Sequence, residues 1–268
     1  MSALSLTLDT PALAEHYEKA SVDRQFKAGK QLIEKLDVQP GQRVLDVGAG
    51  TGLLAEHVAA IVGQKGWVTA VDPLPLRITI AKRKAKPNLT FLVGDAYDLD
   101  NFADAKFDVV YLNAVFHWFP EKKQPLANFF RVLKSGGRLG ISTGSKDHPS
   151  LVHGIQREVL AREPYSAFVK PETGLPHRVS ERELRLLLEE AGFSVPTLEL
   201  AQHRVVHASA ESALEHHQAS SFGNLLGHLP PELQQRATQD IAAALQQHRA
   251  PEGFVVDGAR IVAVAVKP

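Results

Sequence analysis

Residues 43–58 read RVLDVGAGTGLLAEHV, an aliphatic run followed by three glycines within five positions and then by a helical pattern. Glycine has no Cβ atom, so it permits a positive φ in a tight turn and lets a ligand approach the backbone. Gly48, Gly50 and Gly52 come where the strand would end and the helix would begin. The stretch therefore predicts a buried strand that leads into a ligand-binding turn, with a tight turn that binds nothing as the alternative.

Short β-rich runs alternate with helical patterns along the chain. One of these patterns places Leu54, Val58, Ile61 and Val62 on a single helix face. Repeated alternation of apolar strands with helices predicts a doubly wound α/β fold, whose parallel strands are buried on both faces of the sheet. The expected strands are residues 43–48, 67–72, 89–95, 107–113, 137–143, about 195–206 and 253–266, and a second helical face comprises Leu126, Phe129, Phe130 and Leu133.

The C-terminal half contains one helix with clear boundaries and a longer helical stretch. Ser180 and Glu183 form a capping-box pattern before an apolar helix, and Gly192 stands where that helix would stop. Residues 207–252 are mostly helical in pattern and separate the last two expected strands. They predict a helical cap inserted between those strands.

This organisation predicts four parts of the chain. Residues 1–37 would be N-terminal helices that cover the ligand site. Residues 38–206 would form the α/β core, including a lid segment at 144–179. Residues 207–252 would be the cap, and residues 253–268 would be the final strand of the core. The lid and the cap both leave from the carboxyl edge of the sheet, where α/β folds bind ligands.

The composition excludes several classes of function. Thirty basic and thirty acidic residues give a formal charge of zero, and no stretch concentrates Lys and Arg enough to follow a nucleic-acid backbone. The sequence has no cysteine, which excludes disulfides, thiolate metal sites and cysteine nucleophiles. No apolar run approaches the ~18 residues of a membrane span, and the N-terminus lacks a signal-peptide pattern. We therefore expect a cytoplasmic protein that binds neither nucleic acid nor membrane.

Acidic residues close the next two expected strands. Asp72 follows Gly52 by twenty residues, where nucleotide-binding folds place a carboxylate that accepts two ribose hydroxyls. Asp95 could accept a hydrogen bond from an adenine amino group. NAD enzymes also carry an acid at the first position, but Leu53 stands where their G-x-G-x-x-G fingerprint requires a small residue. The pattern favours an adenosine ligand, with ordinary strand-ending turns as the alternative.

Taken together, these motifs resemble the Rossmann-like, class I S-adenosylmethionine-dependent methyltransferases, in the branch that acts on small molecules. VLDVGAGTG (44–52) is similar to the family's glycine-rich motif, VTAVDP (68–73) to its ribose motif and GDA (94–96) to its adenine motif. FDVVYLNAVFHWF (107–119) resembles the fourth-strand motif, and RVLKSGGRL (131–139) resembles the segment that enters the fifth strand. The resemblance implies a seven-stranded, mostly parallel sheet whose last strand runs antiparallel beside the fifth.

The resemblance also implies S-adenosyl-L-methionine as cofactor, with S-adenosyl-L-homocysteine as its product. Asp46 would orient the methionine portion, Asp72 would hold the ribose, Asp95 would meet the adenine amine and Asn113 would lie near the sulfonium. Tyr17 matches a residue that many relatives fold over the cofactor, with an amphipathic surface position as the alternative. The implied cofactor-binding residues are Tyr17, Asp46, Gly48, Ala49, Gly50, Gly52, Asp72, Pro73, Asp95, Ala96 and Asn113.

The residues that bind the methyl acceptor are expected after the fourth strand and in the lid segment. His117 is the candidate catalytic residue, as a general base or an orienting donor, with a packed residue at a helix start as the alternative. Trp118 is expected to form a wall of the pocket. His177 and Arg178 lie in the lid loop, where Arg178 could clamp an acidic substrate or could simply be solvated.

The sequence therefore predicts an enzyme that transfers a methyl group directly to an O, N or C nucleophile of a small molecule, with a carboxylate or hydroxyl oxygen favoured. The enzyme would be a monomer or a homodimer. The alternatives are a methyltransferase of macromolecules and a protein that binds S-adenosylmethionine without transferring the methyl group. The histidines include no H-E-x-x-H pattern, and no metal site is expected.

Overall fold

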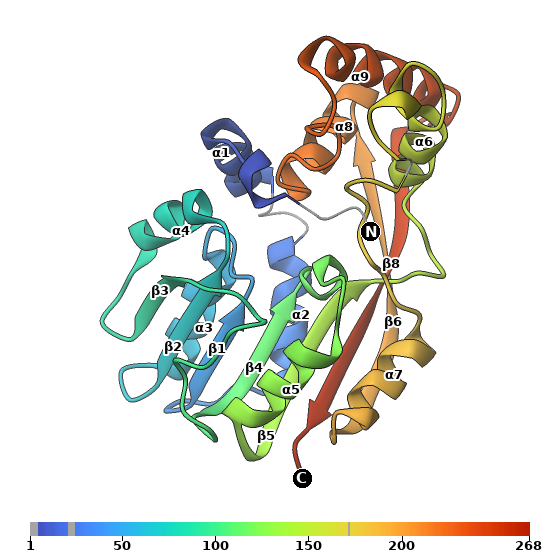
Figure 1. Ribbon diagram of the computed structural model, residues 1–268. Coiled ribbons are helices and arrows are strands. Elements are labelled where there is room, and N and C mark those ends of the chain that lie inside the picture. Colours follow the sequence, from blue (N-terminus) through green and yellow to red (C-terminus); the bar gives the residue numbers. More distant parts are fainter. Residues whose placement is uncertain (1–4, 21–24, 171) are drawn as a thin grey trace. The chain divides into compact units, whose positions relative to one another are not determined.

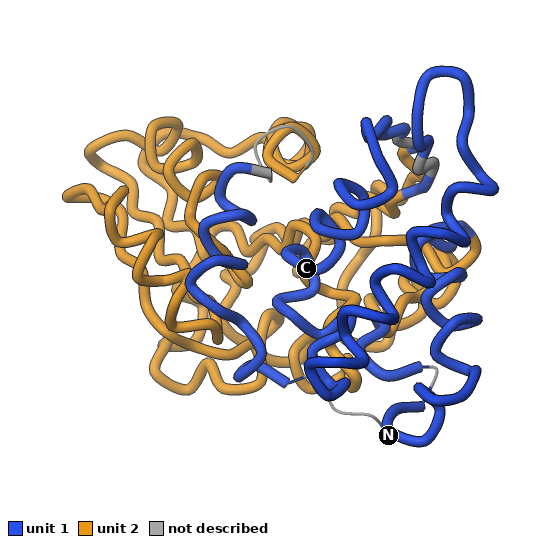
Figure 2. The backbone as a smooth tube through the Cα atoms, turned by 90° about the horizontal axis from the view of Figure 1, so that it is seen from above, with its two compact units in different colours: residues 1–20, 148–176, 202–259 blue, residues 21–147, 177–201, 260–268 orange. Residues whose placement is uncertain are grey.

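The computed structural model describes residues 5–20, 25–170 and 172–268. The chain divides into two compact units, each built from three segments (Figure 2). Unit 1 comprises residues 1–20, 148–176 and 202–259, and unit 2 comprises residues 21–147, 177–201 and 260–268. The glycine-rich turn and the four strands that follow it along the chain all belong to unit 2, which is therefore the unit that contains the candidate cofactor site.

The strands join in one sheet in the order β3-β2-β1-β4-β5-β8-β6 (Figure 1). β1 to β5 pair in parallel, whereas β8 runs antiparallel to β5 from the Arg138–Val266 pair to the Gly144–Arg260 pair. This order and the reversed last pair confirm the predicted doubly wound fold. The strands are β1 (Arg43–Val47), β2 (Trp67–Asp72), β3 (Leu89–Val93), β4 (Phe107–Asn113), β5 (Leu133–Gly144), β6 (Ser194–His207), the short β7 (Arg249–Ala250), which pairs with β8, and β8 (Gly253–Val266).

Helices cover both faces of the sheet in unit 2. The alternation of side chains along each strand sends Val44 to one apolar cluster and Leu45 to the other, and both side chains are fully buried. α5 and α7 supply side chains to the cluster of Leu45 and lie together on one face (Figure 1), whereas α2, α3 and α4 supply the cluster of Val44. The helices of unit 2 are α2 (Lys27–Leu36), α3 (Leu53–Val62), α4 (Pro75–Ala81), α5 (Lys123–Val132) and α7 (Glu181–Glu190).

Local signals set the ends of α7 as predicted. The Ser180 side chain accepts a 3.1 Å hydrogen bond from the backbone N–H of Glu183, and the Glu183 carboxylate accepts one of 2.7 Å from the N–H of Ser180. Gly192 follows the helix with a φ of 94°, which only glycine adopts without strain. Both ends of this helix therefore follow from short-range interactions.

The expected helical face ending at Leu133 was one residue too long. α5 ends at Val132, and Leu133 begins β5, where it pairs with Phe107. Leu133 is fully buried in its strand, as it would have been on a helix face. Because apolar spacing reports burial rather than backbone conformation, the periodicity did not distinguish the two structures at this position.

Unit 1 has an apolar core of its own. Side chains of three helices pack together with Phe254 of β8, and α1 contacts α8. The hydroxyl of Tyr165 donates a 2.5 Å hydrogen bond to the carboxylate of Asp240 on α9. α8 and α9 lie between β6 and β8 in the chain, so the predicted helical insertion is confirmed. The helices of unit 1 are α1 (Pro11–Ala20), α6 (Leu151–Leu160), α8 (Ala210–Ser220) and α9 (Pro231–Gln246).

Candidate functional site

The turn between β1 and α3 requires glycine at two positions for two separate reasons. Gly48 and Gly52 have φ values of 77° and 85°, which side chains disfavour. A Cβ added at Gly48 would lie 2.3 Å from Cγ2 of Val115, and one added at Gly52 would lie 2.7 Å from Cε1 of Phe91. Gly52 caps α3 without any side-chain hydrogen bond, so the first N–H groups of this helix point toward the turn. Such a helix start can bind ligand oxygens.

Asp72 connects this turn to the end of β2. Its Oδ2 accepts a 2.8 Å hydrogen bond from the backbone N–H of Gly50, and its Oδ1 accepts one of 2.9 Å from Leu74. The residue is buried, and the N–H of Gly48 donates to the carbonyl of the neighbouring Val71. Each carboxylate oxygen can accept more than one hydrogen bond. Asp72 is therefore able to shape the turn and to accept ligand hydroxyls as well.

Asp46 is buried on β1 directly behind the turn. The hydroxyl of Tyr111 on β4 donates a 2.7 Å hydrogen bond to its Oδ2. Burial raises the pKa of Asp46, the hydrogen bond from Tyr111 lowers it and the charge of Asp72 raises it, and together these effects bring the pKa to about 7. Burial also raises the pKa of Tyr111 well above its ordinary value, so this hydroxyl stays a donor. The carboxyl group of Asp46 therefore titrates at a much higher pH than an ordinary aspartate.

The other predicted cofactor residues of unit 2 follow the ends of β2, β3 and β4. Pro73 comes directly after Asp72. Asp95 is exposed and accepts a 3.1 Å hydrogen bond from the N–H of Tyr97, as in an ordinary turn, while Ala96 beside it is buried. Asn113 donates a 2.9 Å hydrogen bond to the carbonyl of Gln25, just before α2. Part of the Asn113 amide is therefore occupied in holding the start of unit 2 against β4.

His117 and Trp118 form a short 3-10 turn, Phe116–Trp118, after β4. Nδ1 of His117 lies 3.0 Å from Oγ1 of Thr143 and 3.5 Å from the backbone nitrogen of Gly144, which donates to it. An Nδ1 that accepts from a backbone N–H leaves the proton of a neutral imidazole on Nε2. His117 and Trp118 pack ring against ring, with centroids 5.0 Å apart. The arrangement suits a hydrogen-bond donor at Nε2 better than a general base at that atom.

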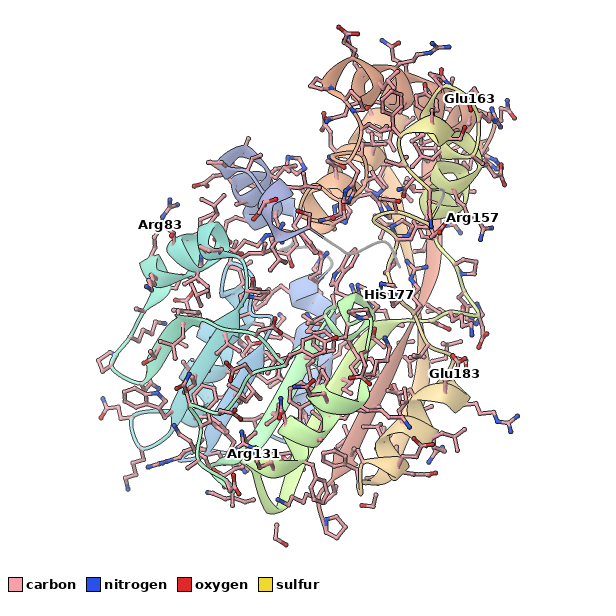
Figure 3. The ribbon with its side chains drawn as sticks, viewed as in Figure 1. Arg83, Arg131, Arg157, Glu163, His177 and Glu183 are labelled. Carbon is pink, nitrogen blue, oxygen red and sulfur yellow. The ribbon has the colours of Figure 1, made fainter. Side chains whose placement is uncertain are left out.

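His177 and Arg178 lie at the same end of the sheet as His117. The backbone N–H of His177 donates a 2.7 Å hydrogen bond to the carbonyl of His117, and Figure 3 shows His177 where β4 and β5 end. Burial lowers the pKa of His177, and the charge of Lys122 lowers it further. Nε of Arg178 lies 3.1 Å from the position that a Cβ of Gly144 would occupy. The structure thus groups three of the four predicted acceptor-site residues around the ends of β4 and β5, with Trp118 packed beside them.

Comparison with known families identifies this arrangement. Residues 45–141, which include the glycine-rich turn, Asp72 and Asn113, match the family model described as a methyltransferase domain. The segment is a class I methyltransferase domain. The fold and the motifs agree with those of the family that uses S-adenosylmethionine.

Curated relatives match this methyltransferase domain rather than the whole chain. The ubiquinone/menaquinone biosynthesis C-methyltransferase UbiE of Vibrio vulnificus is 35% identical over 113 residues, which are 40% of this chain and 43% of the relative. The arsenite methyltransferase of Mus musculus is 32% identical over 134 residues, 44% of this chain and 34% of the relative. The chain therefore spans less than half the length of either relative.

A solved structure agrees with the fold. The S-adenosylmethionine-dependent methyltransferase from Aquifex aeolicus superposes with a TM-score of 0.54 at 24% identity, and the match covers 70% of this chain and 91% of that protein. At this identity the likeness is evidence for the fold of the methyltransferase domain alone.

Sequence reasoning missed two residues of unit 2 that contact predicted site residues. Tyr111 is buried behind the glycine-rich turn on Asp46, and Arg260 on β8 donates a 3.4 Å hydrogen bond to Oδ1 of Asn113. A tyrosine in an apolar strand gave no signal beyond its burial. Arg260 could be placed only once the register of β8 against β5 was known.

Tyr17, the remaining predicted cofactor residue, lies on α1 in unit 1 and is half-buried, and its role stays a prediction. Within the described part of the chain, no group of three His, Asp or Glu side chains could hold a metal ion. No helix among the described residues is long and apolar enough to cross a membrane.

Proposed function

We propose that this protein transfers a methyl group from S-adenosylmethionine to a small-molecule acceptor, at an oxygen, nitrogen or carbon atom. The observation that carries the proposal is the hydrogen bond from the N–H of Gly50 to Asp72, which holds the carboxylate that would bind the ribose against a turn that requires glycine. The family match of residues 45–141 supports the same conclusion.

The residues of this turn fit the cofactor. A Cβ at Gly48 or Gly52 would collide with Val115 or Phe91, so glycine is needed for the backbone to form the turn against which the methionine portion would lie. Asp72 would accept the ribose hydroxyls, and the carboxylate of Asp46 would orient the methionine ammonium. Asp95 would accept from the adenine amine. We further propose contacts from Ala49, Gly50, Pro73, Ala96 and Asn113.

Bound S-adenosylmethionine would supply a methyl group that is already electrophilic, because it is carried on a sulfonium. The protein then has to align the acceptor and exclude water. We assign the alignment to His117, whose Nε2–H would donate a hydrogen bond to the acceptor, and the adjacent wall to Trp118. Thr143 and Gly144 hold the imidazole in that orientation through Nδ1.

A small acceptor is supported by the charge of the chain and by the names of its relatives. Thirty basic residues balance thirty acidic ones, which disfavours a nucleic-acid substrate. Of the relatives named above, one is described as an enzyme of ubiquinone and menaquinone biosynthesis and the other as an arsenite methyltransferase. Both descriptions refer to small molecules. The present sequence has no cysteine thiolate that could hold a soft metalloid such as arsenite.

Two measurements test the proposal. Isothermal titration with S-adenosylhomocysteine reports whether the cofactor site exists. Incubation with S-adenosylmethionine that carries an isotopically labelled methyl group, together with pooled acids, phenols, amines and quinols, reports transfer by mass spectrometry. We expect saturable binding and a labelled product. Absence of binding would overturn the proposal, and binding with label found only in protein or RNA of a cell extract would replace the small-molecule acceptor by a macromolecular one.

A further inference from the structure

We infer that the acceptor carries a carboxylate, and that Arg178 and Arg260 hold this group beside the carboxyl end of β5. The inference rests on the proposed methyl-transfer function and specifies its substrate class. It is built from residues of unit 2 alone.

Both arginines lie beside one residue of β5, Gly144. Gly144 and Arg260 are directly opposite each other in the antiparallel β5–β8 pair. Residues that face each other across such a pair have Cβ positions about 5 Å apart on the same side of the sheet. Nε of Arg178 lies 3.1 Å from the position of a Cβ on Gly144, so the side chain of Arg178 crosses the place that a larger residue would fill. Glycine at this position therefore allows both guanidinium-bearing side chains to lie on the same side of the strand end.

Polar groups continue along that side of the sheet. Ser142 stands two residues before Gly144, on the same face, and is the cross-strand neighbour of Asn113 on β4. Asn113 accepts the 3.4 Å hydrogen bond from Nη1 of Arg260. The Ser142 side chain is fully buried, and its hydroxyl has no hydrogen-bond partner among the residues that the structure describes. A buried hydroxyl in that state is costly unless a ligand or a water bonds to it.

A carboxylate matches these groups in charge and in geometry. The planar guanidinium of arginine presents parallel N–H donors that pair with both oxygens of a carboxylate. Arg260 is only 8% exposed, which strengthens its interaction with an anion relative to a surface arginine.

The inference is tested on the full chain saturated with S-adenosylhomocysteine, in a buffer free of phosphate and carboxylates. The probes are benzoate and hexanoate, compared with their neutral isosteres benzamide and hexanamide, and binding is read as a saturable rise in melting temperature. We expect at least one acid to bind at least tenfold more tightly than its amide. Equal responses to acid and amide, or no saturable response to either acid, would overturn the inference without affecting the proposed function.

Three substitutions test whether the acid binds at the proposed carboxylate site. Arg178→Gln and Arg260→Gln should each weaken binding of the acid at least tenfold, while the affinity for S-adenosylhomocysteine changes less than threefold. Gly144→Ala should weaken binding of the acid several-fold with no change of charge, because the new Cβ displaces Arg178.

Arg157→Gln is the matched control, since it removes an exposed arginine of α6 (Figure 3). Loss of S-adenosylhomocysteine binding in both arginine variants would instead assign the pair to the cofactor's own carboxylate and overturn the inference. Should the variants fail to fold, the comparison of acid with amide on the unaltered protein still decides.

Discussion

Asp46 and Tyr111 are directly opposite each other in the parallel β1–β4 pair, and the tyrosine hydroxyl donates a 2.7 Å hydrogen bond to the carboxylate. This contact lowers the pKa of Asp46, whereas burial and the nearby Asp72 raise it. The balance leaves a buried carboxyl group that titrates at about neutral pH, directly behind the turn that would bind a cationic ammonium group. Its charge therefore depends on pH and on the ligand.

Asp46→Asn should remove a pH-dependent loss of stability. The pKa of Asp46 is raised from 3.8 to about 7 in the folded protein, so between these values the folded state binds more protons than the unfolded state. The stability contributed by the neutral carboxyl is fully present below the unfolded pKa and is lost as pH rises toward 7. Because a difference of one between the folded and unfolded pKa corresponds to about 1.4 kcal/mol, the loss is at most about 4 kcal/mol. In urea unfolding without cofactor, the free energy of unfolding of the asparagine variant should therefore rise relative to that of the parent protein between about pH 4 and pH 7.

Tyr111→Phe provides the matched control for that experiment. It removes the bond that lowers the pKa of Asp46, so the pH-dependent loss should extend to a higher pH than in the parent protein. An unfolding free energy that has the same pH profile in all three proteins would show that Asp46 does not titrate in this range.

Asp72→Ala should damage both the turn and the cofactor site. It leaves the N–H groups of Gly50 and Leu74 without their carboxylate acceptor. Each buried donor left without an acceptor lowers the free energy of unfolding by about 1 to 3 kcal/mol. We expect at least a tenfold loss of affinity for S-adenosylhomocysteine by calorimetry, together with lower stability in urea. Asp72→Asn, which keeps one acceptor oxygen, should recover part of the stability. Unchanged affinity in the alanine variant would remove Asp72 from the ribose site.

Gly48→Ala should lower the free energy of unfolding more than Gly136→Ala, although the two glycines have similar φ values. Gly48 and Gly136 have φ values of 77° and 74°, but only at Gly48 would the new Cβ meet a neighbour, Val115, whereas it would have open space at Gly136. The strained backbone costs about 1 to 2 kcal/mol in both variants, and overpacking adds about 1 to 3 kcal/mol at Gly48 alone. Urea unfolding measures the difference. Val115→Ala combined with Gly48→Ala should restore part of it, and equal losses at the two glycines would refute the packing argument.

Substitutions at His117 separate an orienting donor from a general base. His117→Ala removes the ring, whereas His117→Gln keeps an amide N–H donor near the position of Nε2. If the Nε2–H group orients the acceptor, kcat should fall at least tenfold in the alanine variant and much less in the glutamine variant. A general base would make both variants equally poor and would remove the acidic limb of the pH profile of kcat/KM. The affinity for S-adenosylhomocysteine, measured alongside, should stay within threefold in both.

The core of the fold could be predicted because its signals are local. The glycines at 48, 50 and 52 and the apolar run before them mark one strand, one turn and one helix without any long-range information. The capping box at Ser180 and Glu183 marks a helix start in the same way. Such signals depend on residues within four positions of each other, which a single sequence displays directly.

The parts that could not be predicted depend on register. Arg260 reaches Asn113 because β8 aligns residue 260 with residue 144, and a shift by one residue would turn that side chain to the other face of the sheet. The contact between Tyr111 and Asp46 depends in the same way on the alignment of β4 with β1. Side-chain pairing across a sheet is thus the information that the pattern along one strand does not contain.

The chain passes repeatedly between its two units, since the three segments of each alternate along the sequence. β6 begins in unit 2 and ends in unit 1, and β8 does the reverse, each over 14 residues. A crossover with a homologous gene at any point between residues 21 and 259 would therefore split both units. If Gly144 and His117 lie at the acceptor site as proposed, a change of acceptor would therefore be expected from point substitutions around them rather than from the exchange of a module.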